Sequence, residues 1–209
     1  MTQTNAEKAY HVIKNKIIKT ELNPGSVINE VELMDELGFG RTPVREALKQ
    51  LQAEDLVTVK PRRGIFVSEL AITDLAQIFE VRVDLESLGA VLATQRITKE
   101  QLIKLEQLVD QYQKIPTNSK EKMIDLDGKF HALIREATQN RFLISNLEYY
   151  YNLSLRIWYM ALPQAAAEEI DVKAHCDIYQ AIVAGNADAA AERISKHIRD
   201  FHKTIKSYL

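Results

Sequence analysis

Residues 33–68 of the chain read LMDELGFGRTPVREALKQLQAEDLVTVKPRRGIFVS, and this stretch decides how the N-terminal part folds. Apolar residues recur at helical spacing on both sides of a Gly38-Phe39-Gly40 break, which predicts two short helices joined by a tight turn. The residues that carry this periodicity are Leu33, Leu37, Val44, Leu48 and Leu51. The pattern favours a helix-turn-helix.

The second helix of the pair has a recognisable beginning. Thr42 can cap it, Pro43 suits the first helical position because its missing N–H has no partner to lose there, and Arg45 follows within the first turn. Arg41 and Arg45 then stand at the end of the helix that such proteins place in the major groove, where arginine can pair with guanine O6 and N7. Lys49, one turn later, is placed for a phosphate contact.

Two alternating apolar runs follow, at residues 56–59 and 65–67. They flank Pro61, Arg62, Arg63 and Gly64, so the pattern predicts a β-hairpin with a basic tip, which is the wing of a winged helix-turn-helix. A helix pair of this spacing in an all-α protein is often no more than packing. The conjunction of a glycine turn, a capped basic helix and an arginine-tipped hairpin favours DNA binding instead.

Composition sets the broad class of the protein. The chain has 209 residues, of which 46% are hydrophobic, and this suits two small domains or one large one. The net charge is −2, but local basic patches, not the overall charge, determine phosphate contacts. The single cysteine, Cys176, excludes an intrachain disulfide and fits a reducing cytoplasm. No apolar run approaches the ~18 residues of a membrane span, so we expect a cytoplasmic protein without a membrane partner.

Long helical stretches without strand-like runs follow the wing. Apolar periodicity and its breaks predict six helices, over residues 73–98, 99–115, 119–138, 141–162, 164–184 and 187–208. The expected fold is therefore mainly α. A winged helix-turn-helix domain would occupy residues 1–71, and an all-α bundle of about six helices, long enough to enclose a pocket, would occupy residues 72–209.

Four residues of the bundle form a candidate metal site. Asp127 and His131 are four positions apart on one helix, so their side chains project from the same face. His175 and His197 lie at nearly equal distances from the Gly185-Asn186 connection, so they are level if the last two helices run antiparallel. Three imidazoles and a carboxylate suit a borderline divalent ion such as zinc, nickel or manganese. On spacing alone, unrelated polar residues on the bundle surface remain an equal alternative.

Residues 40–48, GRTPVREAL, resemble the most specific signature of the GntR family of bacterial transcription regulators. The similarity extends from Ala9 through the wing. The resemblance implies that the reading helix and the wing contact DNA bases and backbone. The residues that would make these contacts are Arg41, Thr42, Pro43, Arg45 and Gly64. Gly64 would let the wing enter the minor groove.

The helical part resembles the FCD domain, the ligand-binding domain of the FadR subfamily within that family. The likeness rests on Asp127-x-x-Phe130-His131, on the block over residues 175–186 and on the last histidine of the set. It implies a metal ion in the bundle centre, held by Asp127, His131, His175 and His197. One or two coordination positions would remain for water or for the carboxylate of an effector.

Two arginines are candidate contacts for that effector. Arg82 matches a position where the family often presents arginine to an acidic ligand, and a guanidinium suits a carboxylate. Arg156 could be a second polar contact. The alternatives are that Arg82 pairs with Glu86 on its own helix, and that Arg156 is a helix-surface or interface arginine. His202, half a turn from the face of His197, is expected to be exposed and not to be a ligand.

Together these features predict a homodimeric bacterial transcription regulator that binds a palindromic operator in double-stranded DNA. A small carboxylic acid, bound at the metal site, would tune its affinity for the operator. Two other classes stay open. A metal-dependent enzyme could use the same ligands to activate water, but no general base accompanies them at a defined spacing, and the fused DNA reader favours sensing. The bundle could also be a dimerisation module in which the histidines are incidental.

Overall fold

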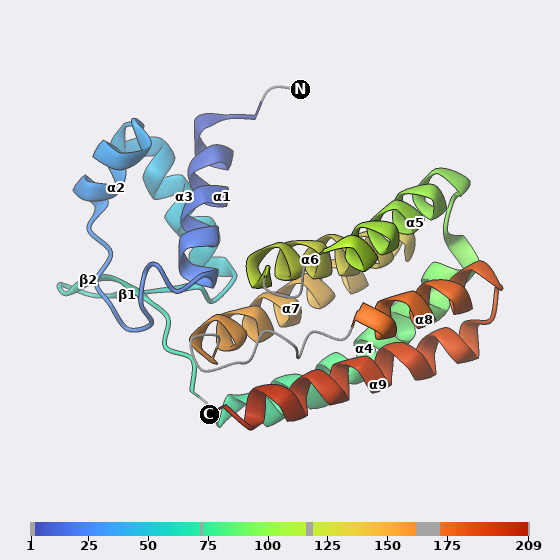
Figure 1. Cartoon of the computed structure of the whole chain (residues 1–209). Helices are drawn as coiled ribbons and strands as arrows, with labels where there is room; N and C mark the ends of the chain where they lie inside the picture. The colour runs from blue at the N-terminus through green and yellow to red at the C-terminus, as the bar shows by residue number, and fades with distance from the viewer. Residues whose placement is uncertain (1–2, 72, 116–118, 162–171, 209) are drawn as a thin grey trace. The chain divides into compact units, whose positions relative to one another are not determined.

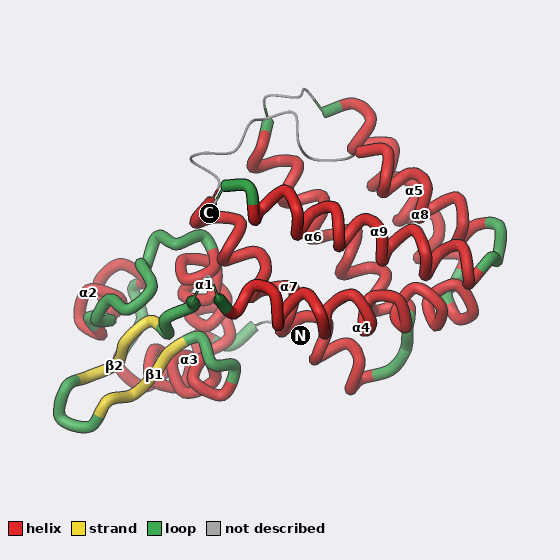
Figure 2. The backbone as a smooth tube through the Cα atoms, turned by 90° about the horizontal axis from the view of Figure 1, so that it is seen from below, coloured by secondary structure: helices red, strands yellow, loops and turns green. Residues whose placement is uncertain are grey.

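A computed structural model describes residues 3–71, 73–115, 119–161 and 172–208 of the chain. They form two compact units, one of Met1–Ile72 with Leu155–Met160 and the other of Thr73–Ser154 with Ala161–Leu209. The described residues are mainly helical, and a two-stranded antiparallel sheet follows the first helices (Figures 1 and 2). The predicted fold class, a winged helix-turn-helix followed by a helical domain, is confirmed.

Helices and a hairpin surround one apolar core in the first unit. Its elements are α1 (Asn5–Ile18), α2 (Glu30–Leu37), α3 (Arg41–Ala53), β1 (Val57–Lys60) and β2 (Gly64–Val67). A capping box between Thr4 and Glu7 begins α1. Gly38, with a φ of 65°, ends α2 in the left-handed conformation that glycine adopts without strain. Ile13, Leu48 and other buried residues of α1, α3 and the hairpin then fix α3 in place.

The start of α3 differs from the prediction. The helix begins at Arg41, its N-cap is Gly40, and no side chain caps it, so the prediction that Thr42 is the cap was wrong. Pro43 consequently occupies the third helical position instead of the first. The helix tolerates proline there because its first four N–H groups have no partner within the helix anyway. As a result Arg41 lies on the helix itself, one turn before Arg45.

The hairpin has the register expected of a wing. Val57 lies opposite Val67, and Lys60 lies opposite Gly64. The turn between the strands places Arg62 at a φ of 62° and Gly64 at 107°, the second of which only glycine adopts readily. Figure 2 shows the two strands beside α3, with the turn extending from the unit.

The second unit is a bundle of long helices. They are α4 (Asp74–Arg96), α5 (Lys99–Lys114), α6 (Lys120–Ala137), α7 (Arg141–Ala161), α8 (Val172–Val183) and α9 (Ala187–Lys206). Residues 164–171 of the helix predicted over 164–184 lie outside the described residues, and the remainder forms α8. Figure 1 shows α4 and α9 side by side along most of their length, and these helices pack together in the bundle.

A second apolar core holds the bundle together. It contains Ala90, Leu105, Phe130, Ile134, Ile178 and Ile194, all of which are fully buried. These residues belong to α4, α5, α6, α8 and α9, so the inner faces of those helices meet in one interior. The candidate metal ligands project from three of these helices. Among the described helices, none combines the length and the apolar character that crossing a membrane requires.

Candidate nucleic-acid interface and metal centre

One stripe of α3 is exposed and polar. Arg41, Thr42, Arg45 and Lys49 are exposed there, as are Glu46, Gln50 and Gln52, and Pro43 is half-buried. Val44, Ala47 and Leu48 of the same helix are buried in the core. Because the buried positions recur every three to four residues, the polar side chains are left together on the opposite face. The structure thus collects on one surface the helix residues predicted to contact DNA.

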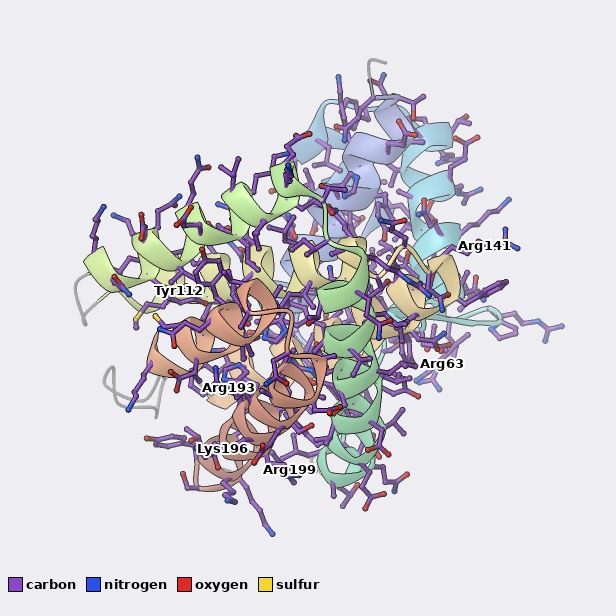
Figure 3. All side chains as sticks on the ribbon, turned by 90° about the vertical axis from the view of Figure 1, so that its right-hand side faces the viewer. Arg63, Tyr112, Arg141, Arg193, Lys196 and Arg199 are labelled. Carbon is purple, nitrogen blue, oxygen red and sulfur yellow. The ribbon has the colours of Figure 1, made fainter. Side chains whose placement is uncertain are left out.

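A groove of about 470 Å³ lies between α3 and the hairpin. Its basic lining residues are Arg45, Lys49, Lys60 and Arg62, and Gly64 also lines it. Arg63, labelled in Figure 3, is exposed at the hairpin turn beside the groove. Positive charge gathered in a concave surface attracts a polyanion more strongly than the same charge spread over the chain. This arrangement suits the phosphate backbone of a nucleic acid.

Arg45 is held by a carboxylate in this groove. Its Nε donates to Oε2 of Glu30 at 2.6 Å, and its Nη2 donates to Oε1 at 3.3 Å. The hydrogen bond from Arg45 lowers the pKa of Glu30, so this carboxylate is ionised near neutral pH. Sequence reasoning missed the contact because the two residues lie on different helices, 15 positions apart.

The bundle brings Asp127, His131, His175 and His197 into one cluster. One potential ligand atom from each residue lies within 4.8 Å of all the others. Oδ1 of Asp127 lies 3.0 Å from Nε2 of His175, 3.7 Å from Nε2 of His131 and 3.9 Å from Nε2 of His197. Ligand atoms about 2.1 Å from one ion lie roughly 3 to 4 Å from each other. Small adjustments would therefore let all four bind a single ion.

Helix geometry explains why these residues meet. Asp127 and His131 are one turn apart on α6 and share a face. His175 on α8 and His197 on α9 lie level across the short connection at Gly185, whose φ of 67° reverses the chain. Their ring centroids are 4.5 Å apart. Because the two histidines lie at nearly equal distances in sequence from this turn, an antiparallel helix pair places them at the same level.

The surroundings of His131 fit a metal ligand most clearly. Its side chain is fully buried, and its Nε2 has no hydrogen-bond partner among the described residues. Its Nδ1 lies 3.3 Å from Oε2 of Glu86. A carboxylate at Nδ1 favours the proton on that nitrogen and leaves a lone pair on Nε2, which is the arrangement found behind metal-bound histidines. The donor set and this unpartnered atom both fit a divalent metal ion.

Other side chains hold the candidate ligands in position. The Tyr151 hydroxyl donates to Oδ2 of Asp127 at 2.9 Å, which leaves Oδ1 to face the histidines. Tyr112 of α5, labelled in Figure 3, stacks on the His175 ring with centroids 4.5 Å apart. Sequence reasoning missed both tyrosines and the contact of Glu86 with His131. The spacing of Glu86 from Arg82 was visible in the sequence, but no local pattern connects the carboxylate to α6.

The charge states of the cluster suit metal binding. Burial alone would raise the pKa of Asp127, but the neighbouring His131 and His175 outweigh it and hold that pKa below its usual range. Burial and the neighbouring His175 hold the pKa of His197 well below its ordinary value. Asp127 is therefore ionised and His197 neutral, and these are the forms in which the two side chains bind a metal.

Two guanidinium groups lie beside the cluster. Arg82 is buried, its Nε donates to Oε1 of Glu86 at 3.3 Å, and its Cζ lies 5.2 Å from the centre of the Tyr151 ring. The ion pair considered as the alternative for Arg82 is thus present. Cζ of Arg135 lies 5.6 Å from the same ring, and its buried Nη1 has no hydrogen-bond partner in the described part of the chain. Sequence reasoning missed Arg135 as a neighbour of the site.

Two further residues singled out in the sequence have contacts of their own. Arg156 belongs to the first unit, where it is buried and its Nη2 donates to the Ser68 carbonyl at 2.7 Å. Arg82 belongs to the same unit as the candidate ligands, and the role of Arg156 as an effector contact stays a prediction. His202 is half-buried and stacks on Phe79, with ring centroids 4.6 Å apart. The expectation that His202 is exposed was wrong, because α4 packs along α9 and covers this position.

Comparison with known protein families gives matches to both parts of the chain. The model of the bacterial regulatory proteins of the gntR family matches residues 5–67. The model of the FCD domain matches residues 77–200. The two matches follow the order of the helix-turn-helix unit and the helical bundle along the chain.

Individual relatives span nearly the whole chain. The HTH-type transcriptional repressor RspR of Escherichia coli (strain K12) is 25% identical over 207 residues, which cover 98% of this chain and 90% of the relative. The uncharacterized HTH-type transcriptional regulator YdhC of Bacillus subtilis (strain 168) is 27% identical over 202 residues, covering 96% and 90%. The solved structure of E. coli McbR/YncC is 19% identical, with a TM-score of 0.86 over 99% of both chains, and shows the same fold.

Proposed function

The chain belongs to the GntR family of bacterial regulatory proteins and carries an FCD domain, and from this premise we propose that it is a DNA-binding transcription regulator. Residues 1–71 would bind DNA, and residues 72–209 would dimerise and bind metal and effector. The observation that carries the proposal is the basic groove between α3 and the hairpin. A regulator of this kind works in the bacterial cytoplasm, where the operator is.

The residues of α3 and the hairpin divide by their proposed role at DNA. Arg41 and Arg45 would contact base edges in the major groove, since a guanidinium can pair with guanine O6 and N7. Lys49 and the hairpin arginines would bind phosphates and fix the register of the protein on the duplex. Thr42 and Pro43 would touch the DNA backbone or base edges. Gly64 would let the wing enter the minor groove.

Two copies of the chain would act together. A single winged domain makes few base contacts, and helix-turn-helix proteins commonly double them through two-fold symmetry. The operator is then palindromic, and its half-sites are spaced to match the two α3 helices. In this arrangement the FCD domain dimerises and carries the regulatory site.

Four side chains of that domain would hold the metal ion. Three imidazole nitrogens and one carboxylate oxygen, from His131, His175, His197 and Asp127, form a donor set that suits a borderline divalent ion. Zinc is favoured, with nickel or manganese as alternatives. The ion would supply a Lewis-acidic position at which an anionic oxygen can bind. Glu86 and Tyr151 would orient His131 and Asp127 around it.

Charge balance supports a small carboxylic acid as effector. The guanidinium groups of Arg82 and Arg135 offset the carboxylates of Glu86 and Asp127 within the buried site. A divalent ion would therefore add positive charge that nothing in this set compensates, and burying uncompensated charge is costly. An effector carboxylate would offset one of the two positive charges of the ion. If it binds two arrangements of the DNA-binding domains with different affinities, it shifts operator binding by that difference.

Selection of binding sites from a random duplex library tests the proposed function. The full chain should enrich a palindromic sequence and bind it with two chains per duplex, which fluorescence anisotropy at stoichiometric concentrations measures. Affinity for a scrambled duplex of the same composition should be lower by a factor of about a thousand or more at physiological salt. Equal affinity for the selected and scrambled duplexes would show that the chain is not a sequence-specific regulator.

A further inference from the structure

A negative charge stands inside the groove proposed to bind DNA. Among the described residues that line it, Glu30 alone is acidic, and the others contribute lysines, arginines and uncharged side chains. A carboxylate facing the phosphate backbone reduces binding to DNA of every sequence, because it repels the polyanion. A carboxylate at this position therefore needs a role that compensates for this loss of affinity. Its contact with Arg45 can provide one.

The contact of Glu30 with Arg45 has a defined geometry. A guanidinium offers one edge formed by Nε–H with an Nη2–H, and a second edge formed by Nη1–H with the other Nη2–H. Glu30 accepts hydrogen bonds from Nε and Nη2, so it occupies the first edge. The second edge remains for a base. Since guanine presents O6 and N7 side by side in the major groove, this edge can bind both of them end-on.

Glu30 is the better fixed partner of the pair. It is the first residue of α2, and Asn29 before it caps the helix by accepting from the N–H groups of Val31 and Glu32. The Glu30 side chain is 26% exposed, whereas that of Arg45 is 55% exposed. Buried Leu33 anchors α2 in the core one turn later. The helix thus provides a firm support for the carboxylate, and the carboxylate orients the longer and more exposed arginine.

We propose that Glu30 is a positioning residue that determines base specificity by holding Arg45 for end-on recognition of guanine. The inference rests on the DNA-reading function proposed above. An exposed ion pair contributes little to folding stability, so its consequence is expected in recognition. Specificity is a difference between two affinities, and Glu30 increases that difference from both sides. It preorganises the contact with the correct base and weakens attraction to DNA in general.

The test compares two duplexes, one selected by the wild-type chain from a random library and a scrambled duplex of the same composition. In Glu30→Gln, affinity for the scrambled duplex should rise, and the ratio of the two affinities should fall by about tenfold, within the discrimination that one bidentate contact supplies. In Glu30→Asp the charge stays but the shorter side chain no longer reaches both nitrogens. The ratio should fall there too, without a rise in affinity for the scrambled duplex.

Asp35→Asn is the matched control, because it removes one negative charge from an exposed position of the same helix. This variant should leave the ratio of affinities unchanged. In an Arg45→Ala background, Glu30→Gln should no longer alter the ratio, since the two residues act as a unit. Thermal unfolding of each variant checks that the fold is retained.

Two failures are distinguishable. If Glu30→Gln and Glu30→Asp keep the wild-type ratio, the carboxylate acts only through its charge and the inference is overturned, while the proposed function stands. If the wild-type chain itself does not distinguish the duplexes, the proposed function fails.

Discussion

The two ring nitrogens of His131 have different surroundings, and this difference commits the side chain to one chemistry. Nδ1 faces the Glu86 carboxylate at 3.3 Å, while Nε2 is buried without a hydrogen-bond partner among the described residues. A buried polar atom left in that state costs about 1–3 kcal/mol. A metal ion would satisfy it. The arrangement therefore costs stability in the metal-free chain and favours binding of the ion.

Glu86→Gln tests this orientation at the level of one residue. The amide lacks the negative charge that strengthens the hydrogen bond to Nδ1, so metal affinity should fall by roughly 10- to 100-fold. Titration against a competing chelator measures the loss. Glu80→Gln, on the exposed side of the same helix, is the control and should bind the metal as the wild type does. Equal affinities in both variants would contradict the role assigned to Glu86.

A second prediction at this scale separates base contacts from phosphate contacts. Arg45→Ala should cost roughly 1–3 kcal/mol on the selected duplex and relax sequence preference, because it removes a bidentate contact to a base. Lys49→Ala should instead weaken binding to all duplexes alike and lower the salt dependence by about one unit. Anisotropy titrations at several salt concentrations measure both effects. Unchanged sequence preference in Arg45→Ala would exclude Arg45 as a base contact.

At the scale of elements, the connection between α8 and α9 controls the register of two candidate ligands. Gly185 has a φ of 67°, and a Cβ built on it meets no atom within 4 Å. Replacement by alanine therefore brings strain in the backbone but no collision. Asn186 follows and caps α9 by accepting from the Ala189 N–H. This turn and cap place His175 and His197 opposite one another.

Gly185→Ala should lower the free energy of unfolding by about 1 kcal/mol, because alanine is disfavoured at positive φ. Gly185→Asn should lose less, since asparagine tolerates the left-handed conformation better. Denaturant unfolding of both variants measures the difference. Equal stabilities of the alanine variant and the wild type would show that the left-handed turn does not form.

Local periodicity explains which elements the sequence could predict. The helices of the bundle and the hairpin follow from spacings within one element or across one short turn. The four candidate ligands were selected by the resemblance to the FCD domain, because spacing alone left an equal alternative. The contacts that were missed join different helices, as Glu30 with Arg45 and Glu86 with His131 do. They depend on how helices pack, which spacing does not specify. His202 is half-buried for the same reason, since α4 covers it.

The start of α3 was missed for a different reason. A helix tolerates proline at any of its first positions, because the N–H groups there have no partner within the helix. The sequence therefore restricted the helix start to a few residues without selecting one. The roles of Arg41, Thr42 and Pro43 at DNA do not depend on that choice and stay predictions.

In the whole molecule, the proposed anion-binding site would be coupled to DNA affinity. If the effector carboxylate binds the metal ion, small carboxylic acids should raise the melting temperature of the metal-loaded chain and lose this effect after the metal is stripped. A thermal-shift screen with and without chelator measures this. A stabilisation that survives complete removal of the metal would place the acid elsewhere. Ligation also needs neutral imidazole. Because burial holds the pKa of His197 well below its ordinary value, protonation should displace the metal from His197 only at a pH below the ordinary histidine range.

The proposed regulation depends on one ion held by four residues, so the metal content per chain decides whether the site exists. Elemental analysis of the purified wild-type chain should find about one divalent ion, and His175→Ala or His197→Ala should each lose most of it. His202→Ala, which alters a histidine of α9 outside the cluster, should keep it. A full complement of metal in both His175→Ala and His197→Ala would contradict the account, and so would its equal loss from His202→Ala.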